Sequence, residues 1–488
     1  MGLSRSRLPG RRLMLALTTA MVVFGLVAGL ITGAFTSLAH GGLYATGLWS
    51  RSGASTVPPG TFDTPAPPAT TTPAPTAGLP SPVLAVAKPS PGADPTRVVA
   101  QLNGVDRAAM QGTFGGTVID LGTGGVLYGN RARRPYIPAS TVKLLTSAAA
   151  LSVLGPEHRF TTTTVAGGKG KIVLVGGGDP YLASKPSASS YPTRASLVDL
   201  AQRTAATLQR SKQRTVALGY DASLFSGPTW HSNWPGGYAD QVTPVSALWV
   251  DEGRVRGVSP GPRVSEPAKN AADAFARALK AQGITVTSVT PAKAATGARV
   301  LGAVKSMPLE RIVEQLLLAS DNDAAEVVFR HTALGAQRPG SFAEARLVVQ
   351  ARLRALGVWI DGTAIHDGSG LSRETRVAAD TLARVLRLAA QETHPELRAV
   401  ITGLPVAGVE GSLQTRFFDG ASVAGRGLVR GKTGTLSKVH ALAGLVRTRD
   451  GSVLIYAFLV NDAENEYAAR VWLDRVSTAL SACGCRKK

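Results

Sequence analysis

Residues 428–462 read LVRGKTGTLSKVHALAGLVRTRDGSVLIYAFLVND. The clearest strand-like runs here are HALAGLVR and SVLIYAFLV. They are joined by Thr-Arg-Asp-Gly, a sequence typical of a hairpin turn. The spacing predicts three successive strands over 428–462. The apolar spacing of residues 464–482 then predicts an amphipathic helix.

The sequence further upstream predicts a mixed α and β body from about residue 96. Residues 115–129 alternate around a glycine-rich turn and predict a strand pair. The run STVKLLTSAAALSVLG at 140–155 has helix-forming residues, an apolar face and a glycine as a stop signal. We therefore expect a strand pair, a helical and irregular middle, three strands and a final helix.

The first of three short motifs is Ser140-Thr141-Val142-Lys143, at the start of the predicted helix. Residues three apart share one face of a helix, so the hydroxyl of Ser140 and the amine of Lys143 lie side by side. A buried lysine beside other cations has a lowered pKa, and a neutral amine can take the proton of a hydroxyl. Alone, the motif is common, and a solvent-facing serine and lysine would explain it equally well.

The other two motifs are Ser320-Asp321-Asn322, after the apolar run RIVEQLLLA, and Lys432-Thr433-Gly434-Thr435, at the start of the three strands. Alone, the second is a helix-end or turn signal. A lysine and hydroxyls along a strand edge suit an anionic group such as a terminal carboxylate. Together and in this order, the three motifs form the constellation of penicillin-binding proteins and serine β-lactamases.

Further stretches resemble one subgroup, the D-alanyl-D-alanine carboxypeptidases/endopeptidases, which are low-molecular-mass penicillin-binding proteins with an inserted domain. These stretches are VGGGDPYL at 175–182, DGSGLSR at 367–373 and LPVAGVEGSL at 404–413. Residues 144–319 separate the first two motifs, and this gap is far longer than in compact β-lactamases. We therefore place an inserted domain at 162–300, which divides the penicillin-binding domain into a first part at 96–161 and a second part at 301–488. We expect the inserted domain to matter for large substrates more than for the catalytic chemistry.

The resemblance implies an α/β (α+β) fold: a five-stranded antiparallel sheet flanked by helices on both faces, with an all-helical lobe beside it and an inserted mixed domain. It also implies the roles of the motif residues. Ser140 is the nucleophile that attacks the carbonyl of the penultimate D-Ala, and Lys143 is the base. Ser320 relays a proton to the leaving amine, and Asn322 holds the substrate amide. The backbone N–H groups of Ser140 and Thr435 would form the oxyanion hole. The carboxylate-binding strand is formed by Lys432, Thr433, Gly434 and Thr435.

The implied function is removal of D-Ala from peptidoglycan stem peptides through an acyl-serine, with β-lactams as covalent inhibitors and with no metal or organic cofactor. Carboxypeptidase and endopeptidase action stay open. Two interpretations stay open for Asp367, Ser369 and Arg373: their side chains line the cleft, or their loop only forms a turn. For Asp179 we favour a turn-forming role.

Three other classes of protein are less consistent with the sequence. A β-lactamase needs a second base for deacylation, and no E-x-x-L-N stretch follows Asn322. A non-catalytic wall-binding protein would have lost a motif residue, and all are present. The formal net charge of +21 suggests an anionic partner, but no block of five or six basic residues occurs and aromatic residues are only 6%, which argues against a nucleic-acid binder.

The N-terminal part predicts a membrane segment and a spacer. Four arginines precede the uncharged run 13–39, which is long enough to span a bilayer with its N-terminus in the cytoplasm. We assign residues 1–40 to an anchor or a cleaved signal segment, a choice that the sequence leaves open. Residues 41–95 are a Pro/Thr/Ala-rich linker, with 12 prolines between 58 and 95. The catalytic body is then expected outside the cytoplasm, in the cell envelope.

The two cysteines, Cys483 and Cys485, exclude a disulfide-stapled scaffold and a cysteine-ligated zinc site in the body. Because the ring of a C-x-C disulfide is small and strained, we expect a free pair without a role.

Overall fold

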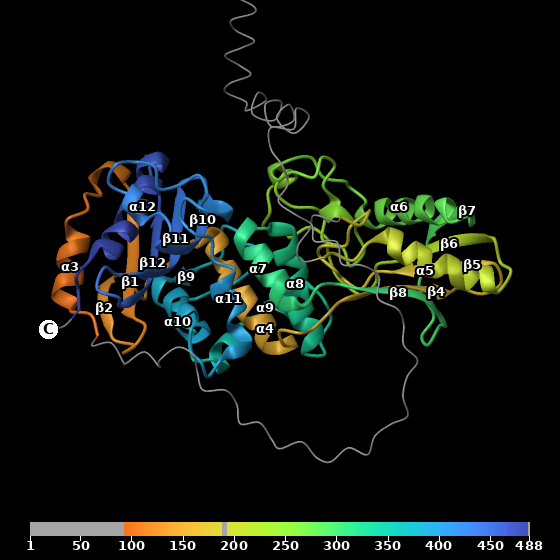
Figure 1. The fold of residues 1–488 in the computed structure, drawn as a ribbon, viewed down its shortest axis with the longest axis horizontal. Coiled ribbons are helices and arrows are strands. Elements are labelled where there is room, and N and C mark those ends of the chain that lie inside the picture. The colour runs from red at the N-terminus through yellow and green to blue at the C-terminus, as the bar shows by residue number, and fades with distance from the viewer. Residues whose placement is uncertain (1–91, 188–192, 487–488) are drawn as a thin grey trace, which may run out of the picture. The chain divides into compact units, whose positions relative to one another are not determined.

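The computed structural model describes residues 92–187 and 193–486 (Figure 1). Its first sheet has five strands in the order β10-β11-β12-β1-β2, and all neighbours are antiparallel. The strands are β1 (Thr113–Asp120), β2 (Val126–Asn130), β10 (Val429–Leu436), β11 (Val439–Arg447) and β12 (Val453–Asn461). The predicted strand pair at 115–129, the three strands at 428–462 and the five-stranded antiparallel sheet are confirmed.

The sheet is buried on both faces, as the side chains of β12 show. These side chains alternate between two cores: Tyr456 and Phe458 belong to one cluster of buried residues, and Ile455 and Leu459 belong to the other. Successive side chains of a strand point to opposite faces. A continuous apolar run therefore marks a central strand with helices on both sides.

Helices supply these two cores. On one face, α12 (Glu466–Ala482) packs against β11 and α3 (Pro95–Asn103) packs beside it. On the other face, α10 (Ala379–Ala389) packs against β1 and β12, and α4 (Lys143–Leu154) lies behind it. Helix α4 ends at Gly155 and α12 covers most of 464–482, as the sequence predicts.

The remaining helices of this part pack around α4 to form a helical layer (Figure 1). They are α7 (Leu309–Ala319), α8 (Asn322–Gly335), α9 (Phe342–Ala355) and the short α11 (Ala399–Thr402). A two-stranded ladder joins β3 (Pro135–Tyr136) to β9 (Val377–Ala378). Short 3-10 turns occur along the chain at Ala108–Met110, Ala139–Val142, Gly236–Tyr238, Asp251–Gly253, Pro395–Leu397, Gly411–Leu413 and Val423–Gly425.

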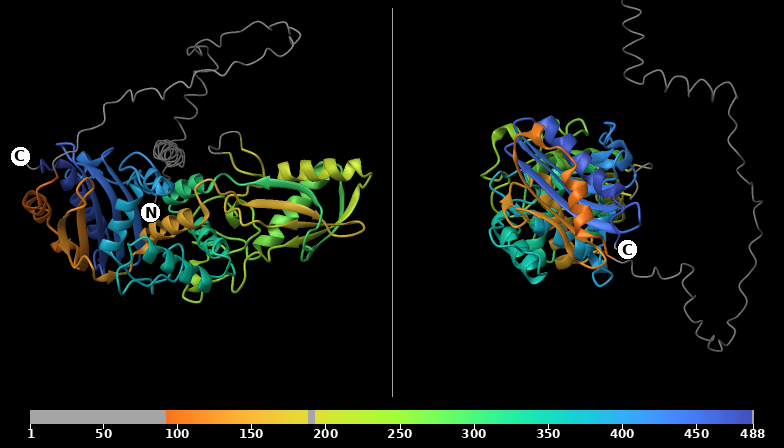
Figure 2. Two further views of the ribbon diagram at one scale, coloured as in Figure 1. Left: turned by 90° about the horizontal axis from the view of Figure 1, so that it is seen from below. Right: turned by 90° about the vertical axis from the view of Figure 1, so that its left-hand side faces the viewer.

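A second sheet covers the interval in which we place the inserted domain and extends beyond it to Lys305 (Figures 1 and 2, yellow and green). Its order is β7-β6-β5-β4-β8, with β5, β6 and β7 parallel and with β4 antiparallel to β5 and β8. Two crossover helices, α5 (Leu197–Arg210) and α6 (Pro267–Ala281), pack with it around a separate core. The strands are β4 (Thr161–Ala166), β5 (Lys171–Val175), β6 (Thr215–Asp221), β7 (Thr285–Pro291) and β8 (Val300–Lys305).

Strands β4 and β8 are neighbours, and Thr161 at the start of β4 pairs with Lys305 at the end of β8. The chain therefore enters and leaves the second sheet at the same point. We propose that this sheet with α5 and α6 is the inserted domain. Its exact boundaries of 162–300 remain a prediction.

The end of α12 corrects the prediction of free cysteines, because Cys483 and Cys485 form a disulfide. After Cys483 the chain turns from helix to extended backbone, so both side chains enter the core beneath α12, where they are 3% and 0% exposed. The carbonyl of Cys485 accepts the N–H of Asp94 at 2.6 Å, and Ala93 pairs with Arg486. These backbone contacts fix the C-terminal segment to the start of α3.

The predicted membrane segment at 13–39 and nearly all of the linker at 41–95 lie outside the described residues. Within the part of the chain that the structure describes, no helix has the length and apolar character needed to cross a bilayer.

Candidate active site

The first motif begins on a tight turn. Ala139 has a left-handed backbone conformation (φ 46°), and a single 3-10 turn over Ala139–Val142 leads into α4 at Lys143. The spacing of three places Ser140 and Lys143 on one side of this turn, as predicted. The amine of Lys143 donates to the hydroxyl of Ser140 at 2.8 Å.

This turn is held between two other segments of the site. A Cβ atom on Gly434 would lie 2.5 Å from the carbonyl oxygen of Pro138, and one on Gly370 would lie 2.0 Å from that of Ala139. Real Cβ atoms do not approach so closely, so both positions need glycine. The glycine of the third motif and a glycine of the DGSGLSR stretch therefore let their backbones touch the turn that carries Ser140.

The second motif forms the corner between α7 and α8. Ser320 caps α7 in a left-handed conformation (φ 57°), and Asp321 caps α8 by accepting the N–H of Ala324. Asn322 is the first residue of α8, and its side-chain oxygen accepts from the amine of Lys143 at 2.7 Å. The corner thus brings the second motif onto the lysine of the first.

The third motif lies on β10, where Lys432 is fully buried. Its amine donates to the hydroxyl of Ser320 at 2.7 Å and to the carbonyl of Thr433 at 2.9 Å. Burial lowers the pKa of Lys432 well below its usual value, and the nearby charge of Lys143 acts in the same direction. Each serine hydroxyl of the site therefore has its own buried lysine.

The motifs meet at an open cleft of about 680 Å³. Six motif residues line it: Ser140, Ser320, Asp321, Asn322, Thr433 and Thr435. A second group comes from the interval of the proposed inserted domain: Gly237, Tyr238, Asp240, Gln241, Arg254, Ser259 and Pro260. The remaining lining residues are Ala319, Leu371, Leu436 and Ser437. The two lysines and Gly434 lie behind this surface.

Lys143 has the electrostatic properties of a base. Complete burial lowers its pKa to about 8, although the carboxyl groups of Glu326, Asp321, Asp367 and Asp323 act in the opposite direction. At pH 7 a lysine with this pKa is neutral in about one molecule in ten, against roughly 3 in 10⁴ for an ordinary lysine. The sequence spacing predicts the contact with Ser140, and burial explains why the amine can accept a proton.

Glu326 is a site residue that the sequence analysis missed. Its carboxyl group accepts the N–H groups of Gly368 and Ser369 at 3.0 and 2.7 Å, and the carbonyl of Ser369 accepts from Lys143 at 2.8 Å. Burial raises the pKa of Glu326 to about 8, and Asp367 adds to the shift. The available signal was its position four residues after Asn322, on the same face of α8.

The DGSGLSR stretch contributes through its backbone. The carboxyl of Asp367 is fully buried and accepts from Gly370, Ser372 and the indole of Trp234. The hydroxyl of Ser369 accepts the N–H of Leu371, and Arg373 is exposed and donates to the carbonyl of Ser437. None of the three side chains is part of the cleft lining, whereas Leu371 is.

Asp179 accepts the N–H of Tyr181, a local contact of the kind found in a turn. Among residues 92–187 and 193–486, no group of three or more His, Cys, Asp or Glu side chains is placed to hold a metal ion.

The chain is similar to known proteins over most of its length. A carboxypeptidase of Mycobacterium tuberculosis is 38% identical over 383 residues, which cover 77% of this chain and 81% of the relative. A D-alanyl-D-alanine carboxypeptidase of Actinomadura is 27% identical over 462 residues, covering 76% and 82%. The crystal structure of penicillin binding protein 4 from Haemophilus influenzae aligns with a TM-score of 0.64 at 20% identity and covers 78% of this chain and 97% of that one.

The fold is thus that of the penicillin-binding proteins and β-lactamases. The model of the D-Ala-D-Ala carboxypeptidase 3 (S13) family matches residues 103–259 and 256–480, and the chain belongs to this family of serine-type D-Ala-D-Ala carboxypeptidases. Its substrate is the peptidoglycan of the cell wall, so the enzyme acts outside the cytoplasm.

Proposed function

We propose that this carboxypeptidase releases the terminal D-Ala of stem peptides through an acyl group on Ser140, with Lys143 as the base. The observation that carries the proposal is the position of the Lys143 amine. It lies within 2.8 Å of the Ser140 hydroxyl, the Asn322 oxygen and the Ser369 carbonyl, in a fully buried setting. The last two oxygens direct the amine, so that its remaining contact is with the nucleophile.

The reaction follows from these contacts. Ser140 Oγ attacks the carbonyl carbon of the penultimate D-Ala while its proton passes to Lys143 Nζ. The backbone N–H groups of Ser140 and Thr435 stabilise the tetrahedral oxyanion. The proton on Lys143 then passes through the hydroxyl of Ser320 to the amine of the terminal D-Ala, which leaves as the C–N bond breaks, and Lys143 is neutral again. Lys143 next takes a proton from a water molecule, whose oxygen attacks the acyl carbon, and returns this proton to Ser140 Oγ as the ester bond breaks.

The substrate carboxylate binds at the third motif. Thr433 and Thr435 line the cleft, and the hydroxyl of Thr433 lies 2.9 Å from that of Ser412, which fixes its position. Lys432 lies behind them on Ser320. We therefore revise the sequence-based assignment: the threonine hydroxyls donate to the carboxylate, and Lys432 acts on Ser320.

A Lys432→Ala variant tests this division of roles. A charge-assisted hydrogen bond contributes about 1.5–3 kcal/mol. We therefore expect acylation by a D-Ala-D-Ala peptide to fall roughly tenfold to a hundredfold. A peptide with a neutral C-terminal amide should react more slowly with both enzymes and by the same factor. If the amide affects only the wild type, Lys432 reads the carboxylate directly.

The proposed function itself is tested by labelling the wild-type protein with penicillin. Intact-mass analysis should show one adduct, and peptide mapping should place it on Ser140. The β-lactam complex of the Haemophilus influenzae protein supports this expectation. An adduct on any other residue would contradict the assignment of the nucleophile.

We further propose that residues 13–39 hold the enzyme at the outer face of the membrane and that residues 41–95 space it from the bilayer. The four preceding arginines and the uncharged run support this. Alkaline carbonate washing of membranes releases a cleaved, peripheral form and leaves a spanning form in the pellet. Release of the full-length chain would contradict the anchor.

A further inference from the structure

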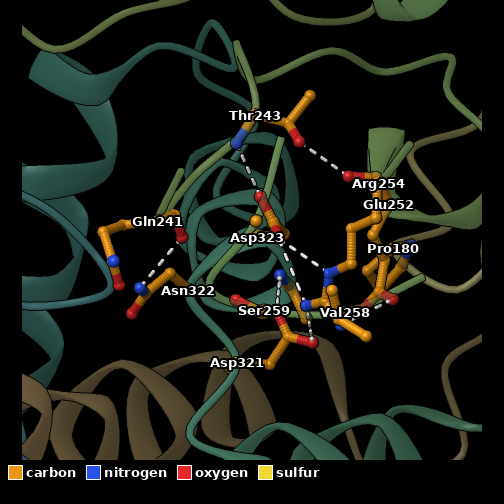
Figure 3. Close-up of polar contacts among 12 residues, drawn as sticks. Pro180, Gln241, Thr243, Glu252, Arg254, Val258, Ser259, Asp321, Asn322 and Asp323 are labelled. Atoms are coloured by element: carbon orange, nitrogen blue, oxygen red, sulfur yellow. Dashed lines mark hydrogen bonds and ion pairs between the residues drawn. The ribbon is translucent and has the colours of Figure 1, made fainter. Parts of the chain in front are cut away.

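The carboxyl group of Asp323, next to Asn322, faces the inserted interval rather than the cleft. It is fully buried and accepts the N–H of Thr243 at 2.7 Å. It also accepts from the guanidinium groups of Arg254 and Arg263, each at 3.2 Å. Figure 3 shows Thr243, Arg254 and Asp321 around it. Three separate positions of the interval 241–263 thus meet on one carboxylate.

The same segment touches Asn322 itself. The carbonyl of Gln241, two residues before Thr243, accepts from the side-chain nitrogen of Asn322 at 3.1 Å (Figure 3). An asparagine amide has one donating and one accepting end. A carbonyl at the donating end therefore leaves the oxygen facing the other way, toward Lys143.

Two arginines and three carboxyl groups meet in this cluster. Burial raises the pKa of Asp323 to about 6, with a further contribution from Asp321, so its carboxyl is ionised at pH 7. Burial also acts to raise the pKa of Asp321, but a hydrogen bond shared with Glu252 and the charge of Arg254 lower it overall. Burial and the nearby Asp321 raise the pKa of Glu252 well above its usual value, and Arg254 also pairs with this carboxyl group at 3.2 Å. The two arginines thus pair with the carboxyl groups of Asp321, Asp323 and Glu252.

We propose that Asp323 is a positioning residue, which holds the Gln241 carbonyl against the amide of Asn322 and thereby keeps the Asn322 oxygen on the base. Its own carboxyl is not part of the cleft lining. The proposal rests on the proposed function of Lys143 and extends it to the inserted interval. It also argues against our expectation that this interval acts on large substrates more than on the chemistry.

An Asp323→Asn variant tests the proposal, with Asp474→Asn as the matched control. Asp474 is also buried, pairs with Arg416, and accepts the N–H of Phe417, but it lies on α12. Each variant keeps the volume of the side chain. Asp323→Asn removes the buried ion pairs with Arg254 and Arg263, and Asp474→Asn removes the one with Arg416. Both are expected to lower the melting temperature. Only Asp323→Asn should lower the second-order rate constant of acylation by a fluorescent penicillin, by roughly tenfold to a hundredfold, because small displacements of catalytic groups have effects of this size.

A double-mutant cycle with Asn322→Ala identifies the route of the effect. If Asp323 acts through Asn322, Asp323→Asn should change acylation by less than about twofold in the Asn322→Ala background. Additive losses would overturn the proposal. Equal acylation rates in Asp323→Asn and Asp474→Asn would overturn it as well.

Arg254→Lys gives a second variant if Asp323→Asn does not fold. Lysine keeps the charge but lacks the forked guanidinium that reaches both Asp321 and Asp323. The acylation rate of Arg254→Lys should therefore lie between the rates of the wild type and of Asn322→Ala. Its effect should again not add to that of Asn322→Ala in the double variant. Additivity here would mean that Arg254, which lines the cleft, contacts the substrate directly, and the proposal would fall. Mapping of the wild-type adduct distinguishes failure of the proposed function from failure of the positioning role alone. A wild type labelled elsewhere than Ser140 refutes the proposed function, whereas labelling at Ser140 with unaffected variants refutes only the positioning role.

Discussion

Replacing Ser140 by alanine is expected to abolish covalent labelling by penicillin and the release of D-Ala from stem peptides. The substitution removes the only atom in the proposed mechanism that bonds to the substrate. Activity should fall by at least roughly a thousandfold, as it does when a serine nucleophile is removed from enzymes of this kind. Intact-mass analysis after incubation with penicillin is the direct measurement, and quantification of free D-Ala is the second.

Ser147→Ala is the matched control on the same helix. Ser147 is fully buried in α4, and its hydroxyl has no hydrogen-bond partner among the described residues. Removing an unpaired buried hydroxyl is close to neutral for stability. This variant should be labelled like the wild type. An adduct that persists in Ser140→Ala would show that another residue is the nucleophile.

Replacing Lys143 by methionine should lower acylation by roughly 10²–10⁴-fold, the range for loss of a general base. The loss should exceed that of Lys432→Ala, because Lys143 contacts the nucleophile whereas Lys432 contacts Ser320. Methionine preserves most of the side-chain length without the amine. A melting temperature close to that of the wild type, with slow acylation, separates a chemical defect from unfolding.

The pH dependence of the acylation rate also tests the role of Lys143 as the base. Because the pKa of Lys143 is lowered to about 8, the neutral amine becomes more abundant as the pH rises toward 8. Wild-type acylation should rise about tenfold per pH unit below this value and level off above it. Glu326 titrates in the same range, because burial raises its pKa to about 8, and its charge raises the pKa of Lys143. Lys143→Met should lose the rise. A wild-type profile that is flat between pH 6 and 8 would contradict a neutral lysine base.

Much of the catalytic fold can be predicted because its signals are local. Strands β11 and β12 are apolar on both faces, and short turns join them to each other and to β10, so the three strands are visible in the sequence. The contact between Ser140 and Lys143 follows from a spacing of three. The meeting of the three motifs was available only from their order and from the family resemblance, since residues 144–319 and 323–431 separate each motif from the next.

The contacts behind the motifs could not be predicted. Thr243 and Asp323 are 80 positions apart, and the chain between them folds into part of another sheet. Asp321 caps α8, and an acidic residue in the first turn of a helix, such as Asp323, also has a sufficient local explanation. Nothing in the sequence therefore indicates a positioning role for Asp323. The disulfide was missed for a related reason. Ring strain can be judged from the spacing of Cys483 and Cys485, but the core that receives both side chains is formed by distant elements.

The adjacency of β4 and β8 has a mechanical consequence. A body that the chain enters and leaves through two paired strands is joined to the rest by a single ribbon, and such a ribbon can bend and twist. The contacts of Arg254 and Arg263 with Asp323, of Trp234 with Asp367 and of Gln241 with Asn322 attach the inserted interval at further points, at a distance along the chain from that ribbon. Several attachments act as a brace, where the ribbon alone would act as a hinge. Force applied to the inserted part by a bulky cell-wall polymer is therefore transmitted to the corner that carries Ser320 and Asn322.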